Sequence, residues 1–174
     1  MSQYCIKCGQ GLVFQEIEGR QREICTSCGW INYEQRKVSA GVRVTQDGRL
    51  LMVQRGIEPW YGCWYMPAGF VEVDEEPQDA AIREGFEETG LQLKVGKIAD
   101  IYTYSDDPRG NGVVLLYDAE VTGGTLRTSN ETLTVGFYLP EEILGKPLAG
   151  ACSEKQVHDW LKSRKNGHGS RTLE

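Results

Sequence analysis

Three glutamates gather in the stretch REGFEETG, residues 83–90, where Glu84, Glu87 and Glu88 are spaced i, i+3, i+4. On a helix, Glu87 and Glu88 would lie at about −60° and +40° from Glu84, so all three carboxylates would share one face. Like charges at these spacings cost about 0.2–0.5 kcal/mol per pair, which a purely structural helix would avoid. Mg²⁺ prefers oxygen ligands and would reverse the sign of this interaction. The stretch therefore predicts a face that binds a divalent cation.

The helix that carries these glutamates is predicted to run from about Pro77 to Thr89. Proline is well placed in a first helical turn, and Gly90 is well placed to end the helix. Ile82 and Phe86 would fall on the face opposite the glutamates, so we expect them to pack into a core.

Two Cys-x-x-Cys pairs stand near the N-terminus, sixteen residues apart, and each pair is followed by a glycine suited to a tight turn. The four residues are Cys5, Cys8, Cys25 and Cys28. Four thiolates in this arrangement fit tetrahedral Zn²⁺. The alternative is a redox-active or disulfide pair, although one Cys-x-x-Cys would suffice for that. So short a segment has little core of its own, so we predict a structural zinc that supplies most of its folding energy.

The composition is that of a folded globular protein, with 40% apolar and 25% charged residues in 174. The net charge of −6 makes nucleic acid an unlikely main partner. Neither a membrane-spanning run nor the apolar core of a signal peptide is seen, so we expect a cytoplasmic protein without a membrane partner. Cys63 and Cys152 are then expected to be free thiols.

The chain is predicted to divide into a zinc ribbon at 1–33, a catalytic domain at 34–165 and a disordered tail at 166–174. Residues 38–55 predict a β-hairpin around the turn Asp47-Gly48. An irregular aromatic loop follows, then strands at 93–104, 112–121 and 132–139 and an amphipathic helix at 153–164. Strands mixed with two or three helices favour a layered α/β or α+β fold.

The segment GFVEVDEEPQDAAIREGFEETGL, residues 69–91, resembles the Nudix box, G-x5-E-x7-R-E-U-x-E-E-x-G-U, where U is apolar. The matching residues are Gly69, Glu75, Arg83, Glu84, Glu87, Glu88, Gly90 and Leu91. Only Gly85 departs, at a position where a larger apolar residue is usual, and we expect a local packing cost. The resemblance implies a Nudix α/β/α sandwich with a mixed β-sheet and a metal-dependent hydrolase acting on diphosphates.

A four-cysteine ribbon before such a domain resembles two kinds of zinc-ribbon Nudix protein, the NADH pyrophosphatases and a group related to ADP-ribose and FAD pyrophosphatases. The S-Q-P-W-P-F-P-like signature of the first kind is absent, and Pro108 lies seventeen residues beyond Leu91, near a proline common in ADP-ribose hydrolases. The predicted substrate is therefore ADP-ribose or FAD. The alternatives are NADH or another dinucleotide, and a nucleotide-sensing or nucleic-acid-binding module without turnover. The family also suggests a possible homodimer.

The resemblance assigns roles to the residues of the box. Glu84, Glu87, Glu88 and the Gly69 carbonyl would hold Mg²⁺ or Mn²⁺, while Arg83 and Glu75 would orient these ligands. The general base stays open between Glu87 or Glu88 and Glu131, which precedes the predicted strand at 132–139. Glu131 could equally be a solvated loop residue.

Substrate contacts must come from outside the box. Aromatic residues crowd the loop before Gly69 and alternate along the strand at 93–104, and one or two could stack on a base. Arginines of the hairpin could bind phosphate, and so could Arg109 in a loop. The residues that we predict to bind substrate are Arg43, Arg55, Trp64 and Tyr104.

Overall fold

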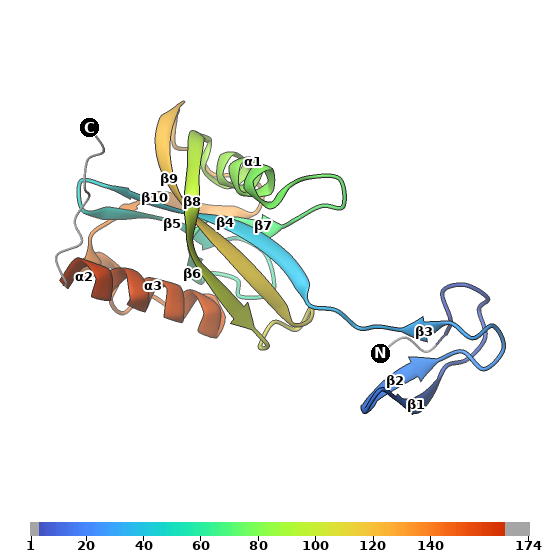
Figure 1. Cartoon of the computed structure of the whole chain (residues 1–174). Coiled ribbons are helices and arrows are strands. Elements are labelled where there is room, and N and C mark those ends of the chain that lie inside the picture. The colour runs from blue at the N-terminus through green and yellow to red at the C-terminus, as the bar shows by residue number, and fades with distance from the viewer. Residues whose placement is uncertain (1–3, 166–174) are drawn as a thin grey trace. The chain divides into compact units, whose positions relative to one another are not determined.

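The computed structural model describes residues 4–165. The chain forms two compact units, Met1–Arg36 and Lys37–Glu174, and each is described by itself (Figure 1). The predicted disordered tail, 166–174, lies outside the described residues.

The N-terminal unit is a small antiparallel sheet in the order β1-β2-β3, formed by Val13–Ile17, Arg20–Ile24 and Ile31–Asn32. Glu18 and Gly19 connect β1 and β2 with φ angles of 54° and 74°, which suits a tight hairpin turn. One cysteine pair precedes β1 and the other lies between β2 and β3. In the described part of this unit, the buried apolar side chains are those of two of these cysteines, so the sulfur cluster is its core.

The second unit contains a mixed sheet whose main path is β10-β5-β4-β9-β8. Its strands are β4 (Lys37–Gln46), β5 (Arg49–Arg55), β6 (Trp64–Tyr65), β7 (Ala68–Phe70), β8 (Leu91–Tyr104), β9 (Gly112–Gly124) and β10 (Thr132–Tyr138). β4 and β9 are parallel and the other pairs are antiparallel, while β6 and β7 pair with β5 and β4. The predicted mixed sheet and the Asp47-Gly48 hairpin are confirmed.

Three helices complete this unit, α1 (Pro77–Thr89), α2 (Pro140–Ile143) and α3 (Gly150–Lys165). α1 begins at Pro77 and ends at Gly90, which has φ 75° and donates its N–H to the Phe86 carbonyl at 2.7 Å. The predicted bounds of this helix are therefore confirmed. α3 begins three residues before the predicted start, and the short elements β6, β7 and α2 were not predicted.

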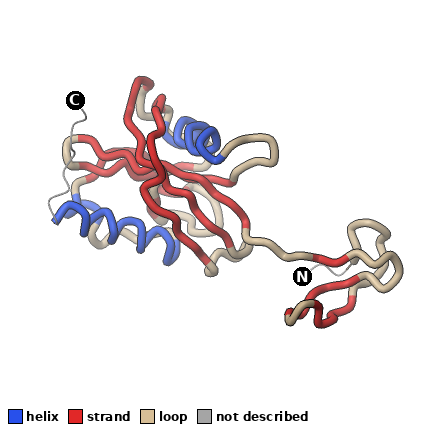
Figure 2. Tube along the Cα trace, in the orientation of Figure 1, coloured by secondary structure: helices blue, strands red, loops and turns tan. Residues whose placement is uncertain are grey.

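Two apolar cores lie on the two faces of the sheet, as the alternation along β5 shows. Leu51 packs with Ala80 and Ala81 of α1, whereas its neighbours Leu50 and Met52 belong to the core that includes Trp160 of α3. Figures 1 and 2 show α1 and α3 on opposite sides of the strands. This arrangement confirms the predicted sandwich and allows both helices to contribute to one site.

The outward face of α1 differs from the prediction. Ile82 and Phe86 are 37% and 41% exposed, so the expectation that they pack into a core is wrong. The helix instead buries mainly small residues, among them Ala80, Ala81 and Gly85. It packs closely at Gly85, where an added methyl group would lie 2.5 Å from the Leu93 Cδ1 atom. Leu93 of β8 lies where a larger residue at position 85 would extend, and the expected packing cost at Gly85 stays a prediction.

Among the residues described here, no helix is both long and apolar enough to cross a bilayer.

Candidate active site

A cavity of about 760 Å³ opens where β4 and β9 begin and β5 and β8 end. Its wall includes Ser39 of β4, Arg55 of β5, Tyr104 of β8 and Val114 of β9. Residues of α1 and α3 also line it, so the two sides of the sandwich meet at this edge of the sheet. The cavity therefore combines the acidic helix with the last helix of the chain.

Glu84 lies directly against the backbone of Gly69, and both residues line the cavity. A methyl group added to Gly69 would lie 2.0–2.3 Å from the carboxyl atoms of Glu84, closer than any real contact. Only glycine leaves room for the carboxylate at this point of β7.

Arg83 ties the acidic residues of this wall together. Its guanidinium donates to Glu75 at 2.6 and 3.1 Å, to Glu84 at 2.7 Å and to Glu87 at 3.3 Å, and also to the Phe70 carbonyl at 3.0 Å. The hydrogen bond from Arg83 lowers the pKa of Glu75, whose other partner is the backbone near Glu72. These contacts connect Arg83 to two of the predicted ligands, and the orienting role of Arg83 and Glu75 stays a prediction.

The carboxylates of this wall exceed the positive charge that Arg83 supplies. Burial raises the pKa of Glu84, and the charges of Glu87 and Glu131 raise it further against the effect of Arg83. Glu87 and Glu131 are exposed and line the cavity. Glu131 precedes β10 as predicted, and its carbonyl accepts the N–H of Gly56 at 2.7 Å, which fixes the backbone there. The wall thus has a net negative charge that a divalent cation would offset.

Glu88 differs from the other two glutamates of the cluster. Its side chain is buried, at 4% exposure, and does not line the cavity. One oxygen accepts the Tyr65 hydroxyl and the other accepts the Ala68 N–H, the latter at 3.1 Å. Burial raises the pKa of Glu88 to about 8. The structure therefore does not bring Glu88 together with Glu84 and Glu87 in the cavity, because the turn of the helix directs it toward Tyr65 beneath the cavity wall.

Besides Arg83, three arginines line the cavity, and two of them, Arg55 and Arg109, are phosphate candidates from the sequence. The side chain of Arg55 is buried, and its Nε donates to the Pro59 carbonyl at 2.7 Å. Arg109 is held by Asp107 at 2.7–3.3 Å, and this pairing lowers the pKa of Asp107. Arg127, which sequence reasoning missed, stacks on the exposed ring of Phe86 at 5.4 Å.

Two of the predicted substrate-binding residues lie elsewhere. Arg43 pairs with Asp118 at 2.7 Å on the neighbouring strand and does not line the cavity. Trp64 packs in the core, edge-on to Tyr138 at 4.9 Å, because it lies in β6, where pairing with β5 fixes its direction. Trp60, in the loop before β6, lines the cavity in its place, and so does Tyr104 as predicted.

Sequence reasoning missed the wall that α3 supplies. Cys152, Ser153 and Gln156 of α3 line the cavity together with Ala149, which precedes the helix, and Ser153 and Gln156 are buried polar residues. Burial raises the pKa of the Cys152 thiol to about 11, so it is a neutral thiol at neutral pH. The amphipathic pattern of this helix gives no local signal that its polar residues face a cavity.

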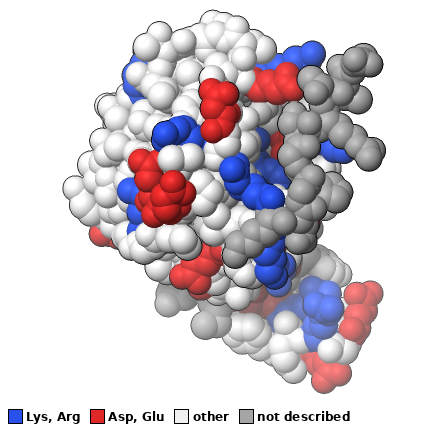
Figure 3. All heavy atoms as spheres, turned by 90° about the vertical axis from the view of Figure 1, so that its left-hand side faces the viewer, with Lys and Arg blue, Asp and Glu red and all other residues white. Residues whose placement is uncertain are grey.

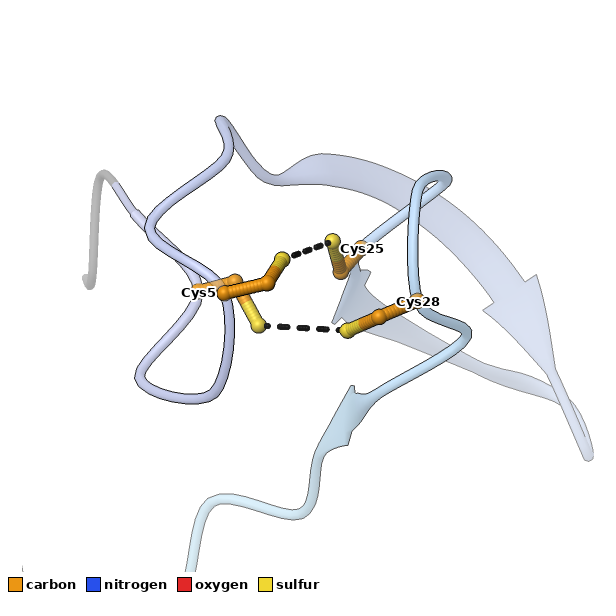
Figure 4. Close-up of side chains that lie close together, drawn as sticks. Cys5, Cys25 and Cys28 are labelled. Carbon is orange, nitrogen blue, oxygen red and sulfur yellow. Dashed lines mark hydrogen bonds between the residues drawn. The ribbon is translucent and has the colours of Figure 1, made fainter.

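The sulfur atoms of the four cysteines of the N-terminal unit lie close together. Figure 4 shows Cys5, Cys25 and Cys28 directed toward one another. The Sγ atoms of Cys5 and Cys28 are 3.6 Å apart, those of Cys8 and Cys25 are 3.4 Å apart, and all four lie within 4.8 Å of one another. Tetrahedral Zn²⁺ with Zn–S bonds of about 2.3 Å requires sulfur separations of about 3.8 Å. The residues therefore fit zinc, and a glycine with φ near 74° turns the chain after each pair.

The carboxylates are gathered less tightly than the sulfur atoms. Within the part of the chain that the structure describes, these cysteines are the single group of three or more His, Cys, Asp or Glu side chains close enough to share an ion as they stand. Mg²⁺ usually takes one or two carboxylates and completes its shell with water and substrate phosphate, so Glu84 and Glu87 with the Gly69 carbonyl still fit it.

Basic and acidic side chains are mixed on the face drawn in Figure 3, where the described lysines and arginines stand in small groups near glutamates and aspartates. An extended basic surface of the kind that binds nucleic acid is not seen on the described part of this face.

Comparison with known proteins then assigns the chain. The NUDIX domain family matches residues 35–161, and the Nudix N-terminal family, a zinc ribbon, matches residues 3–34. The chain belongs to the Nudix hydrolase family. Its similarity extends to the fold, because a Nudix hydrolase from Nitrosomonas europaea superimposes with a TM-score of 0.84 over 99% of this chain and 97% of that one, at 26% identity.

The names of two relatives state a substrate. An ADP-ribose pyrophosphatase of Methanocaldococcus jannaschii is 32% identical over 125 residues, which is 71% of this chain and 72% of the relative. An NAD-capped RNA hydrolase NudC of Haemophilus influenzae is 29% identical over 167 residues, which is 95% of this chain and 62% of the relative. This Nudix hydrolase is thus similar to enzymes that are named for different substrates.

Proposed function

We propose that this Nudix hydrolase cleaves, with Mg²⁺ or Mn²⁺, the diphosphate bond of a nucleoside diphosphate linked to another group, and that its substrate is ADP-ribose or FAD. The observation that carries this proposal is the Glu84 carboxylate, which lies against Gly69, is oriented by Arg83 and faces a cavity lined by three further arginines. Carboxylates for a cation and guanidiniums for phosphate are the two groups that diphosphate chemistry needs.

In this proposal, Glu84, Glu87 and the Gly69 carbonyl hold the cation, and Arg83 keeps both glutamates in place through its hydrogen bonds. The bound cation would neutralise the diphosphate and lower the pKa of a water molecule. Glu88 stays a predicted ligand, and to reach a cation it would have to release the hydrogen bond from Tyr65 or Ala68.

Glu131 is the general base that we favour. It is exposed and lines the same cavity as Glu84, and its charge contributes to the raised pKa of Glu84. The Glu131 carbonyl accepts the N–H of Gly56, which fixes the backbone of Glu131. A general base must lie within hydrogen-bond reach of the proton that it accepts, and a fixed backbone favours this. Glu131→Gln should lower kcat by about 10²-fold without changing Mg²⁺ affinity, because general-base catalysis contributes about 10²–10⁴-fold.

Arg55 and Arg109 are proposed to bind the two phosphate groups. Both are pre-positioned, Arg55 by the Pro59 carbonyl and Arg109 by Asp107, and each keeps further N–H donors for an anion. The zinc is proposed to be structural, because the four sulfur atoms leave no open position at a tetrahedral ion. Zinc thiolates are typical of reducing compartments, so we also propose a cytoplasmic location. Homodimer formation remains a prediction from the family.

A second candidate is NADH or another NAD-linked substrate. It is favoured by the NudC relative, which matches both the ribbon and the catalytic domain of this chain. The absence of the NADH-type signature in residues 98–112 supports ADP-ribose or FAD instead.

A panel of diphosphates with Mg²⁺ tests the proposal. We expect ADP-ribose or FAD to be turned over at least about tenfold more efficiently than NADH or a nucleoside triphosphate. NADH as the best substrate would favour the second candidate, and the absence of turnover on every compound would leave a nucleotide-binding module.

A further inference from the structure

The face of α3 that lines the cavity is polar, although Ser153 and Gln156 on it are buried. Cys152, Ser153 and Gln156 face the cavity, whereas Val157 and Trp160, farther along the helix, pack in the core. The acidic wall of α1 belongs to the opposite face of the sheet, so this polar stripe is a separate part of the cavity.

Gln156 is 5% exposed, yet its amide is only partly satisfied. The Nε2 group donates to the Cys152 Sγ atom at 3.6 Å, and the Oε1 atom has no protein partner among the described residues. In that part of the chain, the one fully enclosed side-chain nitrogen or oxygen without a partner is Arg22 Nε, so Oε1 is open to the cavity. The Ser153 hydroxyl, at 7% exposure, likewise lines the cavity without a protein partner.

Both groups are open to the cavity, so water can satisfy them when no ligand is bound. Two such groups at i and i+3 on one helix face are available to hydrogen-bond a ligand that displaces this water. The contact with Cys152 engages one of the two N–H groups of Nε2, so the amide offers a ligand the Oε1 acceptor and one further N–H.

A flat aromatic ring stands beside this stripe. Trp60 lines the same cavity, and a methyl group added to Gly150 at the start of α3 would lie 3.2 Å from its Cζ2 atom. The start of the helix is fixed in turn by Asp106, whose Oδ2 accepts the Ala151 N–H at 2.8 Å. Trp60 also has a φ of 71°, an unfavourable backbone conformation that persists only where the surroundings hold it.

We propose that the α3 side of the cavity binds the nucleobase of the substrate, with Trp60 stacking on the base and the Gln156 carbonyl oxygen accepting a hydrogen bond from an exocyclic amino group. Adenine, the base of ADP-ribose and FAD, has such a group, and glutamine is a common partner of that amino group in other complexes. This inference rests on the proposed function, because it assumes that the cavity holds a nucleoside diphosphate.

The test compares ADP-ribose with the analogue in which hydrogen replaces the 6-amino group of adenine. Wild-type protein should prefer ADP-ribose by at least about tenfold in kcat/KM, because a site that hydrogen-bonds a group rejects the analogue that lacks it. Gln156→Leu should reduce this preference to within about threefold and leave turnover of the analogue nearly unchanged. Glu154→Leu, an exposed residue of the same helix, is the matched control and should keep the wild-type preference.

Equal losses on both compounds in Gln156→Leu, or a wild-type preference below threefold, would overturn the inference. Thermal unfolding of the variant identifies a loss that comes from misfolding, and binding of both compounds to the variants, measured by calorimetry without added Mg²⁺, gives the same ratio without turnover. If the wild-type protein hydrolyses no diphosphate yet shows this ratio in binding, the proposed function fails and the inference stands. If it hydrolyses ADP-ribose without the ratio, the proposed function stands and the inference fails.

Discussion

Substitution of Gly69 by alanine tests whether the position of Glu84 controls activity. The added methyl carbon would lie 2.0 Å from the Glu84 Cδ atom, and an ordinary contact begins at 3.4 Å, so the carboxyl group must move by about 1.4 Å. A misplacement of about 1 Å at a reacting centre can cost about 10²-fold in rate. We therefore expect Gly69→Ala to lower kcat/KM on ADP-ribose by at least about 10²-fold.

The stability of the same variant should change by less than about 1 kcal/mol, because the obstructed atoms belong to the far end of a flexible side chain. The matched control is Gly41→Ala, whose methyl group would lie 2.5 Å from the Ala68 Cβ and 2.7 Å from the Pro67 carbonyl oxygen. Because two of its close neighbours there are backbone atoms, this control should destabilise the fold by about 1–3 kcal/mol.

A double-mutant cycle isolates the cause of the activity loss. If Gly69→Ala acts by displacing Glu84, the double variant Gly69→Ala/Glu84→Gln should be within about threefold of Glu84→Gln alone. Independent effects would multiply, and the double variant would then be about 10²-fold worse than Glu84→Gln. Multiplication of the two losses, or near-normal turnover in Gly69→Ala, would refute the reasoning.

Three further predictions concern other parts of the molecule. Glu87→Gln should lower kcat by at least about 10²-fold with little change in thermal stability, because it removes a charged cation ligand, and near-normal turnover at saturating Mg²⁺ would contradict that role. Protein purified without chelator should hold about one zinc per chain by elemental analysis, and Cys8→Ser should lose it while the hydrolase unit keeps its unfolding temperature; zinc retained by the variant would count against the four-cysteine site. Gly85→Leu, which restores the residue type usual in the box, should destabilise the protein by about 1–3 kcal/mol because Leu93 occupies the space, and an unchanged unfolding temperature would show that the helix can move away.

Elements with a strong local signal were predictable from the sequence. Asp47-Gly48 specifies a two-residue turn by its own backbone preferences, and Pro77 and Gly90 mark the ends of α1 for the same reason. The direction in which α1 faces was not predictable from its own pattern. It depends on Gly85 and on Leu93, which comes from another strand and decides how closely the helix approaches the sheet.

The residues of the candidate active site likewise include some that the sequence predicted and some that depend on the whole fold. The spacing in the box identified the glutamates around Arg83, and helix geometry brings Glu87 to it at i+4. Glu75 precedes α1, so its contact with Arg83 depends on the turn before the helix. The choice between Trp60 and Trp64 depends on which of them enters a strand, and aromatic composition does not reveal it. Gln156 reaches the cavity only because α3 covers the opposite face of the sheet, which is a property of the whole fold.

The central claim is metal-dependent cleavage of a diphosphate by the Glu84 and Glu87 wall. Its most direct test is the release of AMP and ribose 5-phosphate from ADP-ribose, followed by chromatography during a titration of Mg²⁺, for the wild-type protein and for Glu84→Gln. We predict that both products form in equal amounts, only with the cation, and at least about 10²-fold more slowly in the variant. Cleavage that needs no divalent cation, or that proceeds equally fast in Glu84→Gln, would contradict the account.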